Sequence, residues 1–90
     1  MPLIPKLRQH LKAKAHKLKP IVLLGNQGLT EAVKKEIDRA LHDHELIKIR
    51  FATIDKEAKQ AAFNEISESL HAELVQVIGN IAVLYRQKAK

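Results

Sequence analysis

The chain has 90 residues, which suffices for one hydrophobic core and is too short for two. A formal net charge of +6 and a pI of about 9.8 favour a polyanionic partner, either nucleic acid or an anionic membrane. Cysteine is absent and aromatic residues make up 3%, which excludes a disulfide framework, a thiolate metal site and binding by extensive aromatic stacking. We expect one domain over residues 1–90, no membrane span, no signal peptide and a cytoplasmic location.

The first half of the chain predicts a helix, a strand and a second helix. Apolar residues at helical spacing predict a helix from about Pro5 to Leu18. The short apolar run Ile21–Leu24 predicts a strand that is buried on both faces. After a turn at Gly25–Gly28, Thr30 is the expected N-cap of a helix that runs to about His42.

The second half predicts a strand, a helix and a hairpin. Alternation over Leu46–Phe51 predicts a strand with one covered and one wetter face. A helix is expected from the cap Asp55 to about His71, followed by strands Glu73–Ile78 and Ile81–Arg86 around a two-residue turn. The predicted class is therefore α/β, in the sense of a two-layer α+β fold of order α-β-α-β-α-β-β with a four-stranded mixed sheet.

The loop Gly25, Asn26, Gln27, Gly28 is the strongest candidate for a binding element. Two glycines permit a tight turn and remove the Cβ atoms that would hold a ligand away. The first amides of the following helix lack intrahelical partners and carry the positive end of its dipole. A G-x-x-G pattern alone is common in ordinary turns, but a strand before it, a helix after it and a basic chain favour contact with a nucleic-acid backbone.

Three sequence blocks carry a family resemblance. The segments are KPIVLLGNQGLTEAV at residues 19–33, HELIKIRF at residues 44–51 and ELVQVIGNIAVLYR at residues 73–86. Together they resemble the CRM domain family in its bacterial YhbY-like form, over nearly the whole chain. Three ordered blocks at the family's spacing are far more specific than a single glycine pair.

The resemblance implies a fold similar to the C-terminal domain of translation initiation factor three, with a KH-like GxxG loop. It also implies RNA binding without catalysis, and association with precursors of the large ribosomal subunit as an assembly factor. The family's loop glycines correspond to Gly25 and Gly28, its basic strand positions to Lys48 and Arg50, and its closing VLYR to residues 83–86. Related loops often hold a basic residue where this chain has Asn26 and Gln27, so the charge must come from flanking residues.

Several basic residues could supply that charge. Each of them could instead be an ordinary surface residue that is solvated or salt-bridged. The segment from Lys6 to Lys19 contains no acid. Glu31 and Lys35 are spaced as an i,i+4 pair, which favours Lys34 as the RNA contact on that helix. Tyr85 could stack on a base or simply pack in the sheet. The predicted RNA-binding residues are Gly25, Asn26, Gln27, Gly28, Lys12, Lys14, Lys19, Lys34, Lys48, Arg50 and Arg86.

Other functions have weaker support. The run His42, Asp43, His44 could suggest a metal, but it lacks a third ligand at short spacing and is better read as a solvated turn. No nucleophile or paired carboxylates favour an RNA-processing enzyme, and the first helix lacks the aromatic anchors of a membrane-surface helix. A protein-interaction module recruited to ribosomal particles and a general RNA chaperone remain alternatives. We expect a monomer with no cofactor, no metal and no small-molecule substrate.

Overall fold

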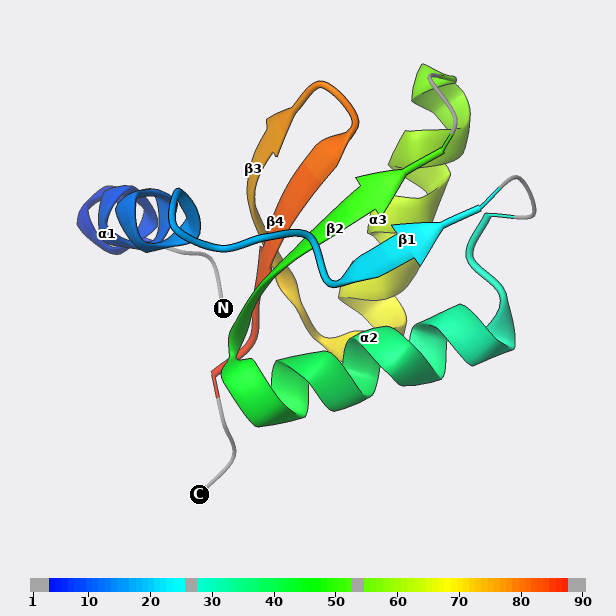
Figure 1. Ribbon diagram of the computed structural model, residues 1–90, viewed down its shortest axis with the longest axis horizontal. Coiled ribbons are helices and arrows are strands. Elements are labelled where there is room, and N and C mark those ends of the chain that lie inside the picture. Colours follow the sequence, from blue (N-terminus) through cyan, green and yellow to red (C-terminus); the bar gives the residue numbers. More distant parts are fainter. Residues whose placement is uncertain (1–3, 26–27, 53–54, 88–90) are drawn as a thin grey trace.

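The computed structural model describes residues 4–25, 28–52 and 55–87, and its elements follow the predicted order α-β-α-β-α-β-β (Figure 1). The fold class predicted from the sequence is confirmed. The elements are α1 (Pro5–Ala15), β1 (Val22–Leu24), α2 (Glu31–His44), β2 (Leu46–Phe51), α3 (Lys56–Leu70), β3 (Glu73–Ile78) and β4 (Ile81–Tyr85).

The four strands form one mixed sheet in the order β1-β2-β4-β3. β1 runs parallel to β2, with Val22 opposite Ile49, and β4 lies antiparallel to both of its neighbours. The β3–β4 hairpin closes with Ile78 opposite Ile81, and Gly79 at its turn has φ +58°. Glycine adopts a positive φ without steric strain, so it suits such a turn. The predicted hairpin is confirmed.

Helices α2 and α3 cover one face of the sheet (Figure 1). Ile37 and Leu41 of α2 and Ile66 of α3 are almost completely buried against the inward residues of the strands. The rings of Phe51 and Phe63 meet edge to face at a centroid distance of 5.2 Å. Aliphatic residues build most of this core, as the low aromatic content requires.

The predicted helix N-caps are also present. The Thr30 hydroxyl accepts a hydrogen bond from the Val33 amide at 3.2 Å, and the Asp55 carboxylate accepts one from the Glu57 amide at 3.0 Å. Each cap satisfies an amide that the first helical turn leaves without a backbone partner. The starts of α2 and α3 are therefore set by the chemistry that their sequences indicate.

Helix α1 packs on the opposite face of the sheet, where it covers only one part. Leu11 and Ala15 form a second small cluster with Leu46, Val75 and Val83. α1 ends at Ala15, three residues earlier than predicted, and residues 16–21 cross to β1 as a linker. The rest of this face is not covered by a helix within the described residues, and we call it the open face.

One prediction about β1 is wrong. The run Ile21–Leu24 suggested a strand buried on both faces, but the side chain of Leu23 is 60% exposed and that of Ile21 is 51% exposed. β1 is an edge strand, and only Val22 and Leu24 point into the core beneath α2 and α3. An uninterrupted apolar run cannot by itself tell a doubly covered strand from one whose second face is open.

Candidate nucleic-acid interface

The glycine loop is a hydrogen-bonded turn at the start of α2. The Gly28 amide donates to the Gly25 carbonyl at 3.0 Å, and Gly28 has φ +75°. A Cβ atom at either glycine would meet nothing within 4 Å, so packing does not demand glycine there. Asn26 and Gln27 lie outside the described residues. Glycine at position 28 therefore allows the positive φ of the turn, whereas the absence of a side chain at Gly25 leaves open space for a ligand.

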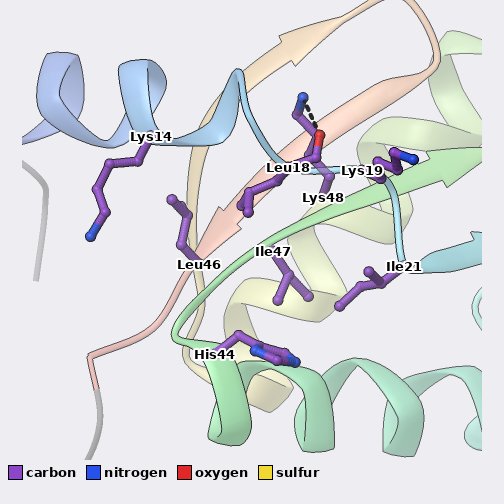
Figure 2. Close-up of a pocket in the computed structure, with 8 residues that line it drawn as sticks. All are labelled: Lys14, Leu18, Lys19, Ile21, His44, Leu46, Ile47 and Lys48. Atoms are coloured by element: carbon purple, nitrogen blue, oxygen red, sulfur yellow. Dashed lines mark hydrogen bonds between the residues drawn. The ribbon is translucent and has the colours of Figure 1, made fainter.

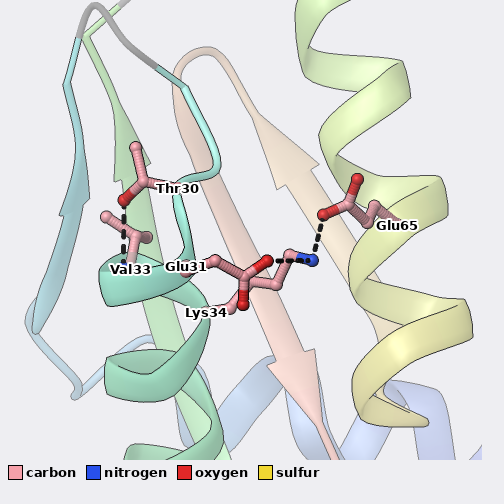
Figure 3. Close-up of polar contacts among 5 residues, drawn as sticks. All are labelled: Thr30, Glu31, Val33, Lys34 and Glu65. Atoms are coloured by element: carbon pink, nitrogen blue, oxygen red, sulfur yellow. Dashed lines mark hydrogen bonds and ion pairs between the residues drawn. The ribbon is translucent and has the colours of Figure 1, made fainter.

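A carboxylate lies beside this loop, and Lys34 neutralises it (Figure 3). Glu65 of α3 lines a pocket of about 310 Å³ together with both loop glycines. Lys34 Nζ lies 2.6 Å from Glu65 Oε2 and 3.2 Å from Glu31 Oε1. Hydrogen bonds with Glu65 and then Glu31 raise the pKa of Lys34 above its ordinary value of 10.5.

This arrangement corrects the reason for choosing Lys34 as an RNA contact. The sequence favoured a pair between Glu31 and Lys35, which would have left Lys34 available. In the structure, Glu31 pairs with Lys34 instead. The Lys34 side chain is only 20% exposed and bridges α2 and α3. The connection to Glu65 could not be read from the sequence, because Glu65 lies on α3, outside the segment that contains the loop.

Arg86 is also engaged within the fold. Its Nη1 donates to Asp38 Oδ1 at 2.7 Å and to the Leu70 carbonyl at 3.0 Å, and its Nη2 donates to the Asp38 carbonyl at 2.9 Å. These bonds join the end of β4 to α2 and to the last residue of α3. An RNA contact by Arg86 stays a prediction, while the geometry gives its guanidinium a structural role.

The other predicted cations gather on the open face and its border with α1. Lys12, Lys14, Lys19, Lys48 and Arg50 line three neighbouring pockets of about 320, 710 and 90 Å³. Among the described residues that line these pockets, none is acidic. Cations from α1, the linker and β2 thus line one surface whose described lining residues include no carboxylate, which is the electrostatic pattern of a polyanion-binding site.

The linker joins these pockets into one surface. Lys19 and Ile21 line both the 320 Å³ pocket and the 710 Å³ pocket. The linker is held in place because Lys48 Nζ donates to the Leu18 carbonyl at 3.0 Å and the Ile21 amide donates to the Lys48 carbonyl at 3.0 Å. Half-exposed Leu18, Ile21 and Leu23 place apolar surface between the cations.

Sequence reasoning missed this apolar part of the surface. It assigned Leu18 to the first helix and Ile21 and Leu23 to a strand interior. The alternation of buried Val22 and Leu24 with exposed Ile21 and Leu23 is invisible in a run composed only of apolar residues. Pro20 indicated that the helix ends before it, but it could not show that α1 already ends at Ala15.

The structure also places Tyr85, the candidate for stacking on a base. Tyr85 is partly buried and, like Leu7, packs against the cluster beneath α1, which agrees with a packing role. Within the described parts of the chain, no three His, Cys, Asp or Glu side chains lie together as a metal site would require. The described helices also include none that is long and apolar enough to cross a membrane.

Comparison with known proteins decides the family. Residues 3–86 match the model of the CRS1 / YhbY (CRM) domain. The chain belongs to the CRM domain family. The resemblance carried by the three sequence blocks is thereby confirmed, and the GxxG loop, β2 and the β3–β4 hairpin all lie within the matched CRM region.

Several proteins are similar to this chain over most of its length. An RNA-binding protein of Haemophilus influenzae is 52% identical over 81 residues, which cover 90% of this chain and 82% of the relative. A probable RNA-binding protein of Pseudomonas aeruginosa is 38% identical over 90 residues, covering 100% of this chain and 86% of that protein. The solution structure of a hypothetical Staphylococcus aureus protein, proposed to bind RNA, superposes with a TM-score of 0.84 and 35% identity over 99% of this chain and 93% of that one.

Proposed function

We propose that this CRM protein binds ribosomal RNA in precursors of the large ribosomal subunit, as a monomeric, non-catalytic assembly factor in the cytoplasm. The observation that carries RNA binding is the open face, where cations from three segments line adjoining pockets that contain no acid among their described residues. The names of the relatives support the same class of partner. The ribosomal target follows from the family resemblance.

The loop and the open face have different tasks in this proposal. The open side of Gly25 and the amides at the start of α2 position an RNA backbone at the loop. Lys34 keeps Glu65 and Glu31 from repelling a phosphate there, instead of itself supplying net positive charge. Most of the attraction comes from the open face, because its cations are not matched by carboxylates along the pockets.

A charge-neutralising variant with a matched control tests RNA binding. The test variant carries Lys14→Gln, Lys19→Gln and Arg50→Gln, three exposed residues of the open face. The control carries Lys35→Gln, Arg39→Gln and Lys56→Gln, which remove the same charge from exposed positions on α2 and α3. We expect the test variant to bind structured RNA about tenfold more weakly, with a salt slope smaller by about 2, since each lost phosphate contact reduces counterion release.

Equal losses in the two variants would contradict the assignment of the open face. Salt-independent binding by the wild-type protein would contradict the electrostatic basis of the proposal. The ribosomal target is tested separately by crosslinking in cells and mapping of the bound RNA. Crosslinks concentrated in large-subunit precursors are expected, and crosslinks spread over unrelated transcripts would favour a general RNA chaperone.

A further inference from the structure

The 320 Å³ pocket lies at the edge of the sheet that borders the open face, between the linker and the first residues of β2 (Figure 2). Leu46 and Ile47 of β2 contribute its buried surface, and Leu18 and Ile21 of the linker contribute half-exposed surface. Its other lining residues are Lys14, Lys19, Lys48 and His44. The pocket therefore combines apolar walls with cations and has no acid among the described residues that line it.

The pocket exists because β1 is short. β1 begins opposite Ile49, so the part of β2 that precedes Ile49 is bordered on this side by the linker instead of a strand. Two hydrogen bonds hold the linker beside this part of β2. One runs from Lys48 Nζ to the Leu18 carbonyl and the other from the Ile21 amide to the Lys48 carbonyl. These hydrogen bonds fix the position of the linker and therefore the shape of the pocket.

The orientation of the β2 backbone adds hydrogen-bonding capacity. Backbone groups of alternate residues in a strand point to opposite neighbours. The Lys48 carbonyl faces the linker, so the amide and carbonyl of Leu46, two residues earlier, are directed to the same side. An occupant can thus meet apolar side chains and backbone hydrogen-bonding groups in a pocket whose lining also includes three lysines.

These features match a single nucleotide. A nucleobase has flat apolar faces and a hydrogen-bonding edge, and its phosphate carries the charge that Lys14, Lys19 and Lys48 attract. A volume of about 320 Å³ lies at the lower end of the range for small-ligand pockets, which suits one nucleotide better than a larger group. A base inside a duplex cannot enter, because its edge and both faces are occupied.

We propose that this pocket receives one unstacked nucleobase of a single-stranded RNA segment, while the lysines around it contact the adjacent phosphates. The proposal rests on RNA binding by the open face and adds a preference for bases that are not in a helix. Lys19 and Ile21 also line the neighbouring 710 Å³ pocket, so the same strand can continue along the linker toward β1.

Abasic RNA separates this proposal from simple charge attraction. The probes are a short single-stranded RNA of mixed sequence and the same strand with its bases replaced by abasic sites, which keeps every phosphate. Purified full-length protein is titrated with each probe at one salt concentration. We expect the intact strand to bind about tenfold more tightly, the order of magnitude for inserting a single base.

A neutral substitution then assigns the preference to the pocket. Ile21→Gln keeps the charge and approximate size of a half-exposed side chain but makes this wall polar. Val77→Gln is the matched control, since Val77 is 43% exposed on β3 and is not among the residues that line this pocket. We expect Ile21→Gln to bring the intact-to-abasic affinity ratio close to one without changing the salt slope, and Val77→Gln to leave the ratio as in the wild type.

The outcomes distinguish this proposal from the function on which it rests. Equal, salt-dependent binding of intact and abasic strands would overturn the nucleobase pocket and preserve RNA binding, leaving a protein side chain as the better occupant. A ratio that survives Ile21→Gln would also overturn it, because the bases would then be recognised elsewhere. Failure of both strands to bind at any salt concentration would overturn RNA binding itself.

Discussion

The guanidinium of Arg8 donates from Nη1 to the backbone carbonyl of Val75 at 2.7 Å. The same nitrogen lies 2.8 Å from the carbonyl of Leu74. The pairing of β3 with β4 shifts register between Leu74 and Gln76, and such an irregularity leaves backbone groups outside the regular ladder. Arg8 satisfies carbonyls at this point and thereby attaches α1 to the sheet.

Replacing Arg8 by Met should loosen α1 specifically. Met keeps an unbranched stem but removes both hydrogen bonds, at a cost of about 1–2 kcal/mol in the free energy of unfolding. Hydrogen exchange should accelerate in α1 more than in α2 or α3, because only α1 depends on this contact. RNA affinity should fall as well, since Lys12 and Lys14 are placed by α1. Gln9→Met, at an exposed neighbouring position, is the control, and unchanged exchange in α1 would contradict the role of Arg8.

Lys34→Met should lower thermal stability at neutral pH, because it leaves Glu65 and Glu31 without their shared cation. The pKa of Lys34 is raised in the folded protein, so the stabilisation is complete below its ordinary value of 10.5 and is lost as the pH rises through the higher folded-state value. On the alkaline side of neutral pH, the difference in melting temperature between wild type and variant should therefore shrink only at strongly alkaline pH. A difference that disappears near neutral pH would point to another cause.

The two loop glycines should respond differently to alanine. Gly28→Ala forces a Cβ into a backbone with φ +75° and should destabilise the protein by about 1 kcal/mol. Gly25 shows no such positive φ, and an added Cβ meets nothing within 4 Å, so Gly25→Ala should leave the unfolding midpoint nearly unchanged. It should nevertheless weaken RNA binding, because the methyl group occupies the space open to a phosphate. Wild-type RNA affinity in a folded Gly25→Ala protein would remove Gly25 from the interface.

Arg86→Lys should affect stability more than RNA binding. Lysine keeps the charge but cannot reproduce the forked contacts with the Asp38 carboxylate, the Asp38 carbonyl and the Leu70 carbonyl. We expect a loss of about 2 kcal/mol in urea unfolding. RNA affinity, measured well below the unfolding transition, should stay within about twofold of the wild type. A large affinity loss with unchanged stability would restore Arg86 to the RNA-contacting set.

Local sequence signals predicted most of the fold. Thr30 and Asp55 mark helix starts, Gly79 marks the hairpin, and the alternation in β2 separates Ile49 and Phe51 from Arg50, as the structure confirms. These features depend on residues close together in the chain. All of them except Asp55 also lie in the blocks that carry the CRM resemblance.

The sequence did not predict the ion pairs between residues that lie far apart along the chain. Which carboxylate meets Lys34 or Arg86 depends on how α2 and α3 pack and where β4 ends, and charge spacing along one helix cannot show it. The exposure of Leu23 depends on β1 being an edge strand, which is a property of the whole sheet. The interface therefore stays a sequence prediction at the level of segments, and the structure adds the distinction between cations that are bonded within the fold and cations that line the open face.

The position of β1 at the sheet edge has a consequence for solubility. An edge strand with exposed apolar side chains such as Leu23 is a template for pairing with another copy of the chain. β1 is only three residues long and shares its pocket with Lys19 and Arg50, and short length and nearby positive charge both discourage such pairing. We therefore expect the cations of the open face also to discourage self-association while no RNA is bound, so that removing their charge favours pairing at this edge.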